Sequence, residues 1–156
     1  MVVNEKYAGI ALSVLRIITA LLFIQHGTAK LFDVPNMTLP SDIMGIPTVA
    51  IGALELVGGL LVMIGLFTRP AALILAGEMA VAYFVAHASK DLYPVLNGGE
   101  PAILFCFIFL LFAATGPGPL SVEDMRGEDD EPGVEGYAAP GGERQYRPED
   151  FGDKVI

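Results

Sequence analysis

The sequence contains no tryptophan, a single cysteine and only two histidines among its 156 residues. Without tryptophan, an aromatic belt at a membrane surface has to use tyrosine and phenylalanine. Cys106 lies inside an apolar run, and there is no Cys-x-x-Cys pair. Internal disulfide exchange and a cysteine-held zinc or iron–sulfur site are therefore excluded, and Cys106 is typical of a small hydrophobic residue.

Basic residues are also scarce, because nine lysines and arginines stand against 18 aspartates and glutamates. Residues 121–156 hold eleven of the acidic and four of the basic residues, a balance of −7 that leaves only −2 for residues 1–120. The acidity argues against nucleic acid as a partner. Since the segment 121–156 is rich in glycine and proline and poor in apolar residues, we expect a disordered or extended acidic tail.

Apolar residues are abundant, at 53% of the chain, and the mean hydropathy is +0.57. Four apolar stretches approach the roughly 20 residues that a helix needs to cross a bilayer. The sequence therefore predicts an all-α fold, a four-transmembrane-helix bundle in residues 1–120 with spans at about 8–32, 47–67, 70–90 and 101–115. The first stretch is expected to stay as a span, because Lys6 alone supplies a basic region before it.

An even number of spans places both termini on one side of the membrane. The basic residues near that side are Lys6, Arg69 and Arg126, against Lys30 and Lys90 on the other. Because basic residues favour the cytoplasmic side, the sequence predicts cytoplasmic termini.

Ionisable residues lie deep inside three of these stretches, where a charge costs roughly a few to more than ten kcal/mol in hydrocarbon. Arg16 and Glu78 are each eight residues from the start of their spans, about 12 Å at the helical rise. Equal depth and opposite charge predict a structural ion pair between the first and third spans.

A second polar layer is predicted near the opposite face, from His26, Lys30, Glu55 and His87. His26 and Glu55 could form a hydrogen-bonded acid–base pair, whereas Lys30 and His87 could instead extend to the headgroups. On the second span, small residues are expected to let a neighbouring helix approach closely: Gly52, Gly58 and Gly59. No set of residues predicts a metal site.

The ordered set of these motifs resembles the DoxX family over roughly residues 10–121. The pattern comprises Arg16 with 23–32, 52–59 with 65–69, Glu78-Met79, His87, 97–100 and 115–121. The resemblance implies a four-helix integral protein of the prokaryotic cytoplasmic membrane. It also implies an association with quinone-linked redox chemistry and membrane oxidoreductase assemblies. Residues after Val122 are not part of the pattern.

Three functions follow as alternatives. In the first, a redox-complex subunit binds a quinone or lipid headgroup in the polar layer, since a quinone carbonyl needs a donor and its reduced form a proton acceptor. No cofactor is expected to be intrinsic, because no dinucleotide fingerprint is present, and haem ligation by His26 and His87 is the less favoured interpretation. The second is a non-catalytic accessory subunit that contacts other membrane subunits through residues 121–156, and the third a lipid or small-molecule carrier. The sequence does not decide whether the protein is an enzyme.

Overall fold

The computed structural model describes residues 5–127 except 39 and 44, and this part of the chain is mostly helical. All four apolar stretches form helices, close to the predicted bounds. They are α1 (Glu5–Phe32), α2 (Thr48–Ile64), α3 (Thr68–Ala82), which continues as the π-helix η1 (Tyr83–His87), and α5 (Glu100–Thr115). Two of these segments, Tyr7–Phe32 and Thr68–His87, are long and apolar enough to cross a membrane, whereas α2 and α5 are apolar but shorter.

Proline and glycine set the boundaries of these helices. Pro47 directly precedes α2 and Pro101 lies in the first turn of α5, where a missing backbone N–H costs nothing. Gly65 ends α2 in the left-handed conformation, and its N–H and that of Leu66 donate to the last carbonyls of the helix. Residues 65–67 thus link α2 to α3. Thr68 and Arg69, which lie between the second and third predicted spans, already belong to α3.

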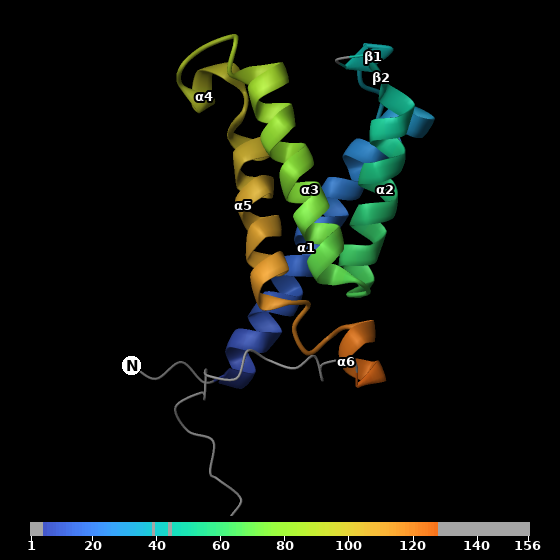
Figure 1. Cartoon of the computed structure of the whole chain (residues 1–156), viewed down its shortest axis with the longest axis vertical. Coiled ribbons are helices and arrows are strands. Elements are labelled where there is room, and N and C mark those ends of the chain that lie inside the picture. Colours follow the sequence, from blue (N-terminus) through green and yellow to red (C-terminus); the bar gives the residue numbers. More distant parts are fainter. Residues whose placement is uncertain (1–4, 39, 44, 128–156) are drawn as a thin grey trace, which may run out of the picture.

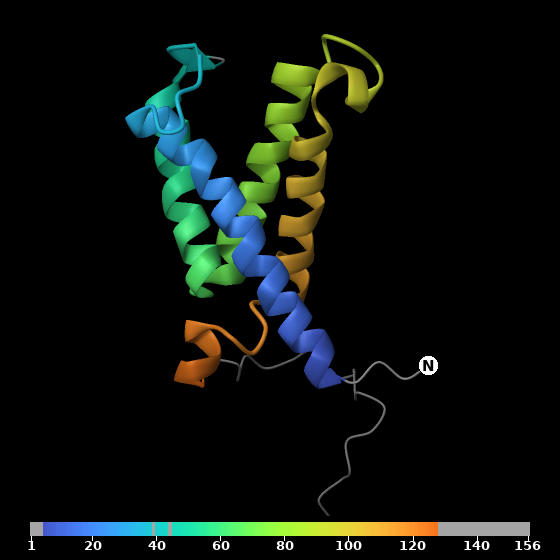
Figure 2. The same cartoon turned by 180° about the vertical axis from the view of Figure 1, so that it is seen from behind.

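The helices pack as two pairs, α1 with α2 and α3 with α5 (Figures 1 and 2). The pairs converge toward the α2–α3 turn and separate toward the opposite end (Figure 1). The core lies where they meet. It contains alanine, aromatic and larger aliphatic residues from all four helices: Ala20, Phe23, Val62, Ala71, Ala72, Leu75, Ala76, Met79, Phe109 and Phe112. Phe23 of α1 reaches α5, with its ring 4.8 Å from that of Phe109 between centroids.

Three short elements in the described residues were not predicted. A two-residue hairpin, β1 (Asp42–Ile43) and β2 (Ile46–Pro47), pairs antiparallel in the first loop, where Gly45 supplies a positive φ for the turn. A single turn, α4 (Pro94–Asn97), lies in the second loop. Figure 1 shows both at the end where the helix pairs separate.

The third unpredicted element is α6 (Val122–Arg126), in the segment expected to begin the acidic tail. Ser121 caps α6 by accepting a hydrogen bond from the N–H of Asp124. Glu123 joins α6 to the α2–α3 turn, because its carboxylate accepts from the N–H of Thr68 at 2.7 Å and its own N–H donates to Gly65. Residues 121–127 are therefore ordered against the helices, and the rest of the predicted tail, 128–156, lies outside the described residues.

Candidate functional site

The site starts from a close approach of two glycines. A Cβ on Gly27 of α1 would lie 2.7 Å from the backbone nitrogen of Leu56, and a Cβ on Gly52 of α2 would lie 2.6 Å from Cβ of Lys30. The backbones of α1 and α2 therefore touch at this level. The contact brings the last turn of α1 against the first half of α2.

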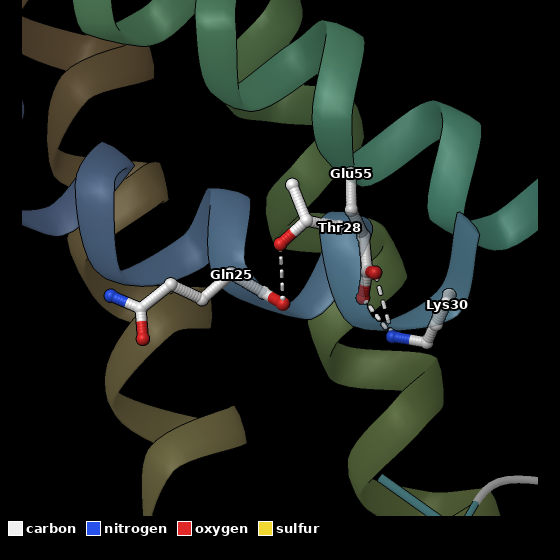
Figure 3. A network of polar contacts seen from close by, with 4 residues as sticks. All are labelled: Gln25, Thr28, Lys30 and Glu55. Atoms are coloured by element: carbon white, nitrogen blue, oxygen red, sulfur yellow. Dashed lines mark hydrogen bonds and ion pairs between the residues drawn. The ribbon is translucent and has the colours of Figure 1, made fainter. Parts of the chain in front are cut away.

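Lys30 and Glu55 meet at this contact in a buried ion pair. The ammonium nitrogen lies 2.5 Å from Oε1 and 2.6 Å from Oε2 of the carboxylate. Lys30 is 11% exposed and Glu55 only 2%, so the pair is nearly removed from solvent. Figure 3 shows the two side chains facing each other, while the side chain of neighbouring Gln25 points away. In this setting a lone charge would be costly, and each residue makes the other tolerable.

Glu78 of α3 adds a second carboxylate beside this pair. Both of its carboxylate oxygens are buried, and neither has a hydrogen-bond partner within residues 5–127 as described. Glu78 lies within electrostatic range of both Glu55 and Lys30. Three ionisable side chains from three helices thus gather at one level, with one positive and two potential negative charges.

A cavity of about 390 Å³ opens beside these three residues, between α2 on one side and α3 with η1 on the other. Its wall is otherwise apolar. Leu54, Ile74 and Val81 line it and are themselves exposed at the outer surface of the helices. The cavity therefore has a charged inner end and an apolar mouth, an arrangement that suits a molecule with a polar head and an apolar body.

A family model for DoxX matches residues 11–88, half of the chain and a range that includes Lys30, Glu55 and Glu78. An uncharacterized protein of Haemophilus influenzae is 42% identical over 125 residues, which cover 77% of this chain and 93% of that protein.

The chain belongs to the DoxX family. The inner membrane protein YqjF of Escherichia coli is 29% identical over 135 residues, covering 78% of this chain and 95% of its own. No solved structure matches the chain. The family and this relative make the chain a membrane protein, and the exposed apolar side chains of its helices agree with that.

In this DoxX protein the predicted polar layer is only partly assembled. Lys30 and Glu55 come together, but His26 does not join them through any hydrogen bond among the described residues. Instead its ring packs against the aromatic rings of Phe23 and Phe105, 6.3 and 6.0 Å away between centroids. Glu55 is satisfied by the ammonium of Lys30, so it does not need the imidazole that the sequence interpretation gave it.

His87 lies apart from the cavity wall as well. Its Nδ1 is 3.0 Å from the carbonyl oxygen of Asn97, which ties the end of η1 to α4. No ring contact or hydrogen bond joins the two histidines in the part of the chain described. Val85 and Ala86 are the η1 residues that reach the cavity.

The predicted ion pair between Arg16 and Glu78 is not formed in the described chain. Arg16 is fully buried, and its guanidinium donates to four backbone carbonyls: Pro117 at 2.8 Å, Val62 at 2.5 Å, Met63 at 2.6 Å, and Leu120. Val62 and Met63 end α2, so Arg16 lies at the level of the α2–α3 turn. Glu78 is ten residues above the start of α3, about 15 Å at the helical rise.

The depth of Glu78 could have been found by counting from the shared turn. Glu55 is nine residues before the end of α2 and Glu78 ten residues after the start of α3, so they are at nearly one height. Counting from the starts of the predicted spans misplaced Arg16 relative to Glu78, because α1 extends below the turn (Figure 2). The signal for Glu78 was present in the sequence, but it was assigned to the wrong layer.

The remaining predicted packing residues lie at two different contacts. Gly59 faces α1, where a Cβ would lie 2.7 Å from Cγ1 of Ile24. Gly58 faces α3, where a Cβ would lie 2.8 Å from Cδ2 of Leu75. Adjacent glycines on α2 thus serve the two neighbouring helices, and α2 joins the two helix pairs below the cavity.

Proposed function

We propose that this DoxX protein is a four-span subunit of the prokaryotic cytoplasmic membrane whose cavity binds the headgroup of a membrane amphiphile, a quinone being the candidate. α2 and α5, of 17 and 16 residues, are about 24–26 Å long, slightly less than a hydrocarbon core of about 30 Å. Each packs alongside a longer helix, and a small local thinning of the bilayer accommodates the difference.

The observation that carries the proposal is the charged end of an otherwise apolar cavity at membrane depth. Ionisable residues inside membrane segments are expensive and usually mark a functional site or pathway. Lys30 supplies a hydrogen-bond donor for a quinone carbonyl, and Glu55 and Glu78 supply acceptors for the hydroxyls of its reduced form. The exposed apolar residues at the mouth give an isoprenoid tail a way out to the lipid.

The redox association of the protein is part of the same proposal. Oxidoreductase partners would supply or receive electrons, and this chain would hold the quinone for them. The second candidate, a non-catalytic accessory subunit, is favoured by one observation, the helix α6, which contacts the α2–α3 turn through Glu123. Deletion of residues 128–156 distinguishes these two candidate functions. Loss of co-purifying subunits without loss of bound quinone supports an accessory subunit that binds its partners through residues 128–156.

A single substitution tests the cavity. Gly77 lines it, and a Cβ added there meets no atom within 4 Å, so Gly77→Leu is expected to fill part of the space. We expect the variant to fold and to lose binding of a short-tailed quinone analogue, measured by calorimetry in nanodiscs. Ala114→Leu, on the exposed face of α5, is the matched control and is expected to bind normally. Equal binding by the wild type, Gly77→Leu and Ala114→Leu would mean that the quinone does not bind in this cavity.

Orientation is proposed with both termini in the cytoplasm. Arg69 and Arg126 lie toward the α6 end, whereas Lys90 follows η1 at the other end. In a Cys106→Ser background, the thiol of a Gly127→Cys variant should be labelled only after the membrane is opened, and that of a Leu92→Cys variant in intact cells. The reverse pattern contradicts this orientation.

A further inference from the structure

Glu78 gives the cavity one more acidic group than basic groups. Lys30 and Glu55 neutralise each other through two contacts, which leaves the carboxylate of Glu78 as an additional acceptor with buried oxygens and no partner among the described residues. A buried polar group without a hydrogen bond is costly, and a carboxylate more so. A ligand that satisfies the ionised carboxylate of Glu78 therefore brings a hydrogen-bond donor or a positive charge.

We infer that the cavity accepts the protonated amine of a lipophilic cation, with Glu78 as the residue that selects it. An ammonium group carries three donors and one positive charge, so it suits Glu78, a carboxylate beside the Lys30–Glu55 pair that has no hydrogen-bond partner of its own among the described residues. Placed beside Glu78, it offsets the repulsion between that carboxylate and Glu55. This inference rests on the proposed amphiphile-binding function of the cavity and names a second class of headgroup, beside the quinone, that Glu78 would accept.

The rest of the cavity fits the apolar part of such a molecule. The wall beyond the charged residues is aliphatic, and small residues on both sides leave room for a chain: Ala50, Gly77, Ala82 and Ala86. The mouth is bordered by exposed Ile74 and Val81 on α3. An alkylamine entering from the lipid would place its head at Glu78 and leave its tail among these side chains.

Matched probes test the inference. Dodecylamine and dodecanol share a tail and differ in the charge of the head, and their binding to the full chain in phosphatidylcholine nanodiscs can be measured by calorimetry at neutral pH. We expect wild-type protein to bind the amine at least tenfold more tightly than the alcohol. Glu78→Gln should remove this preference, Glu78→Asp should keep it, and Glu100→Gln, an exposed carboxylate in the first turn of α5, should leave it unchanged.

The contrary results are distinct. Equal binding of amine and alcohol by the wild type overturns the selection of a cation and indicates that a bound proton satisfies Glu78. A preference for the amine that survives in Glu78→Gln overturns the assignment of that selection to Glu78. If Gly77→Leu still abolishes binding of both probes in either case, the cavity remains a ligand site and the proposed function stands. Folding of each variant is checked by its unfolding temperature, and Glu78→Asp keeps the test informative if the glutamine variant is unstable.

Discussion

Arg16 connects segments that are distant in the sequence through its hydrogen bonds. Its guanidinium satisfies two carbonyls at the end of α2 and two in the segment that follows α5. The last carbonyls of a helix lack partners within the helix and carry partial negative charge, so a cation placed there is stabilised. A planar group with five donors meets four acceptors at once, which an ammonium group does not.

Arg16→Leu is therefore expected to destabilise the protein strongly, by about 3 kcal/mol or more, since hydrogen bonds to a charged group contribute about 1.5–3 kcal/mol each. Arg16→Lys should recover only part of the loss. Unfolding followed by circular dichroism in a mild detergent measures both. If adding Glu78→Gln to Arg16→Leu restored stability, the original idea of an Arg16–Glu78 pair would be correct after all.

The Lys30–Glu55 pair makes a different prediction. Removing one member leaves a buried charge alone, at a cost of about 3–5 kcal/mol, whereas removing both costs much less. We expect Lys30→Met and Glu55→Gln each to lower the unfolding temperature more than the double substitution does. Additive losses in this double-mutant cycle would mean that the two residues do not interact.

The sequence predicted part of the site at this scale. Lys30 and Glu55 were placed in one layer by their depth, and the structure joins them. His26 was given the role that Lys30 has, because a histidine and a lysine one turn apart on α1 cannot be ranked without the rotation of the helix. That rotation is set by the contact between Gly27 and Gly52, which turns Lys30 toward α2 and His26 toward Phe105.

Among the helices, two glycines with opposite surroundings allow a matched test. Gly52→Ala places a methyl group 2.6 Å from Cβ of Lys30, whereas Gly77→Ala places one in open space. An alanine raises helix propensity by about 1 kcal/mol over glycine, so Gly77→Ala should be neutral or stabilising. Gly52→Ala should be destabilising and should disturb the Lys30–Glu55 pair. The unfolding temperatures of both variants test this expectation, and equal changes in the two would contradict the close contact of α1 with α2.

Helix α6 gives a prediction about truncation. Deletion of residues 128–156 should leave the unfolding temperature nearly unchanged, because the contacts of Ser121 and Glu123 remain. Deletion from residue 121 onward should lower it, since the N–H of Thr68 and the carbonyl of Gly65 lose their partners. Equal stability of the two truncated proteins would show that α6 does not support the turn.

Helix positions were predictable because apolar length and proline are local signals. The hairpin β1–β2 and helix α6 were not, for a physical reason. Two-residue strands are too short to show an alternating pattern. The sequence of α6 resembles other acidic segments, and its helix is supported by the hydrogen bond that the Glu123 carboxylate accepts from the N–H of Thr68. Such elements depend on contacts with parts of the chain that are distant in sequence.

At the scale of the whole molecule, two tight helix pairs meet at one end and separate at the other (Figure 1). Lys30, Glu55 and Glu78 border the cavity between α2 and α3, whereas Arg16 lies at the level of the α2–α3 turn. Stability is thus concentrated near the α2–α3 turn, and the cavity occupies the more open half. This division separates the residues expected to fold the protein from those expected to bind a ligand.

The central claim is that this open half binds an amphiphile in the native membrane. Native mass spectrometry of the protein released directly from its own membrane, for the wild type, Gly77→Leu and Ala114→Leu, tests it most directly. We predict a bound small molecule on the wild type and on Ala114→Leu that is missing from Gly77→Leu. The same adducts on all three proteins, or none on any of them, would contradict the claim.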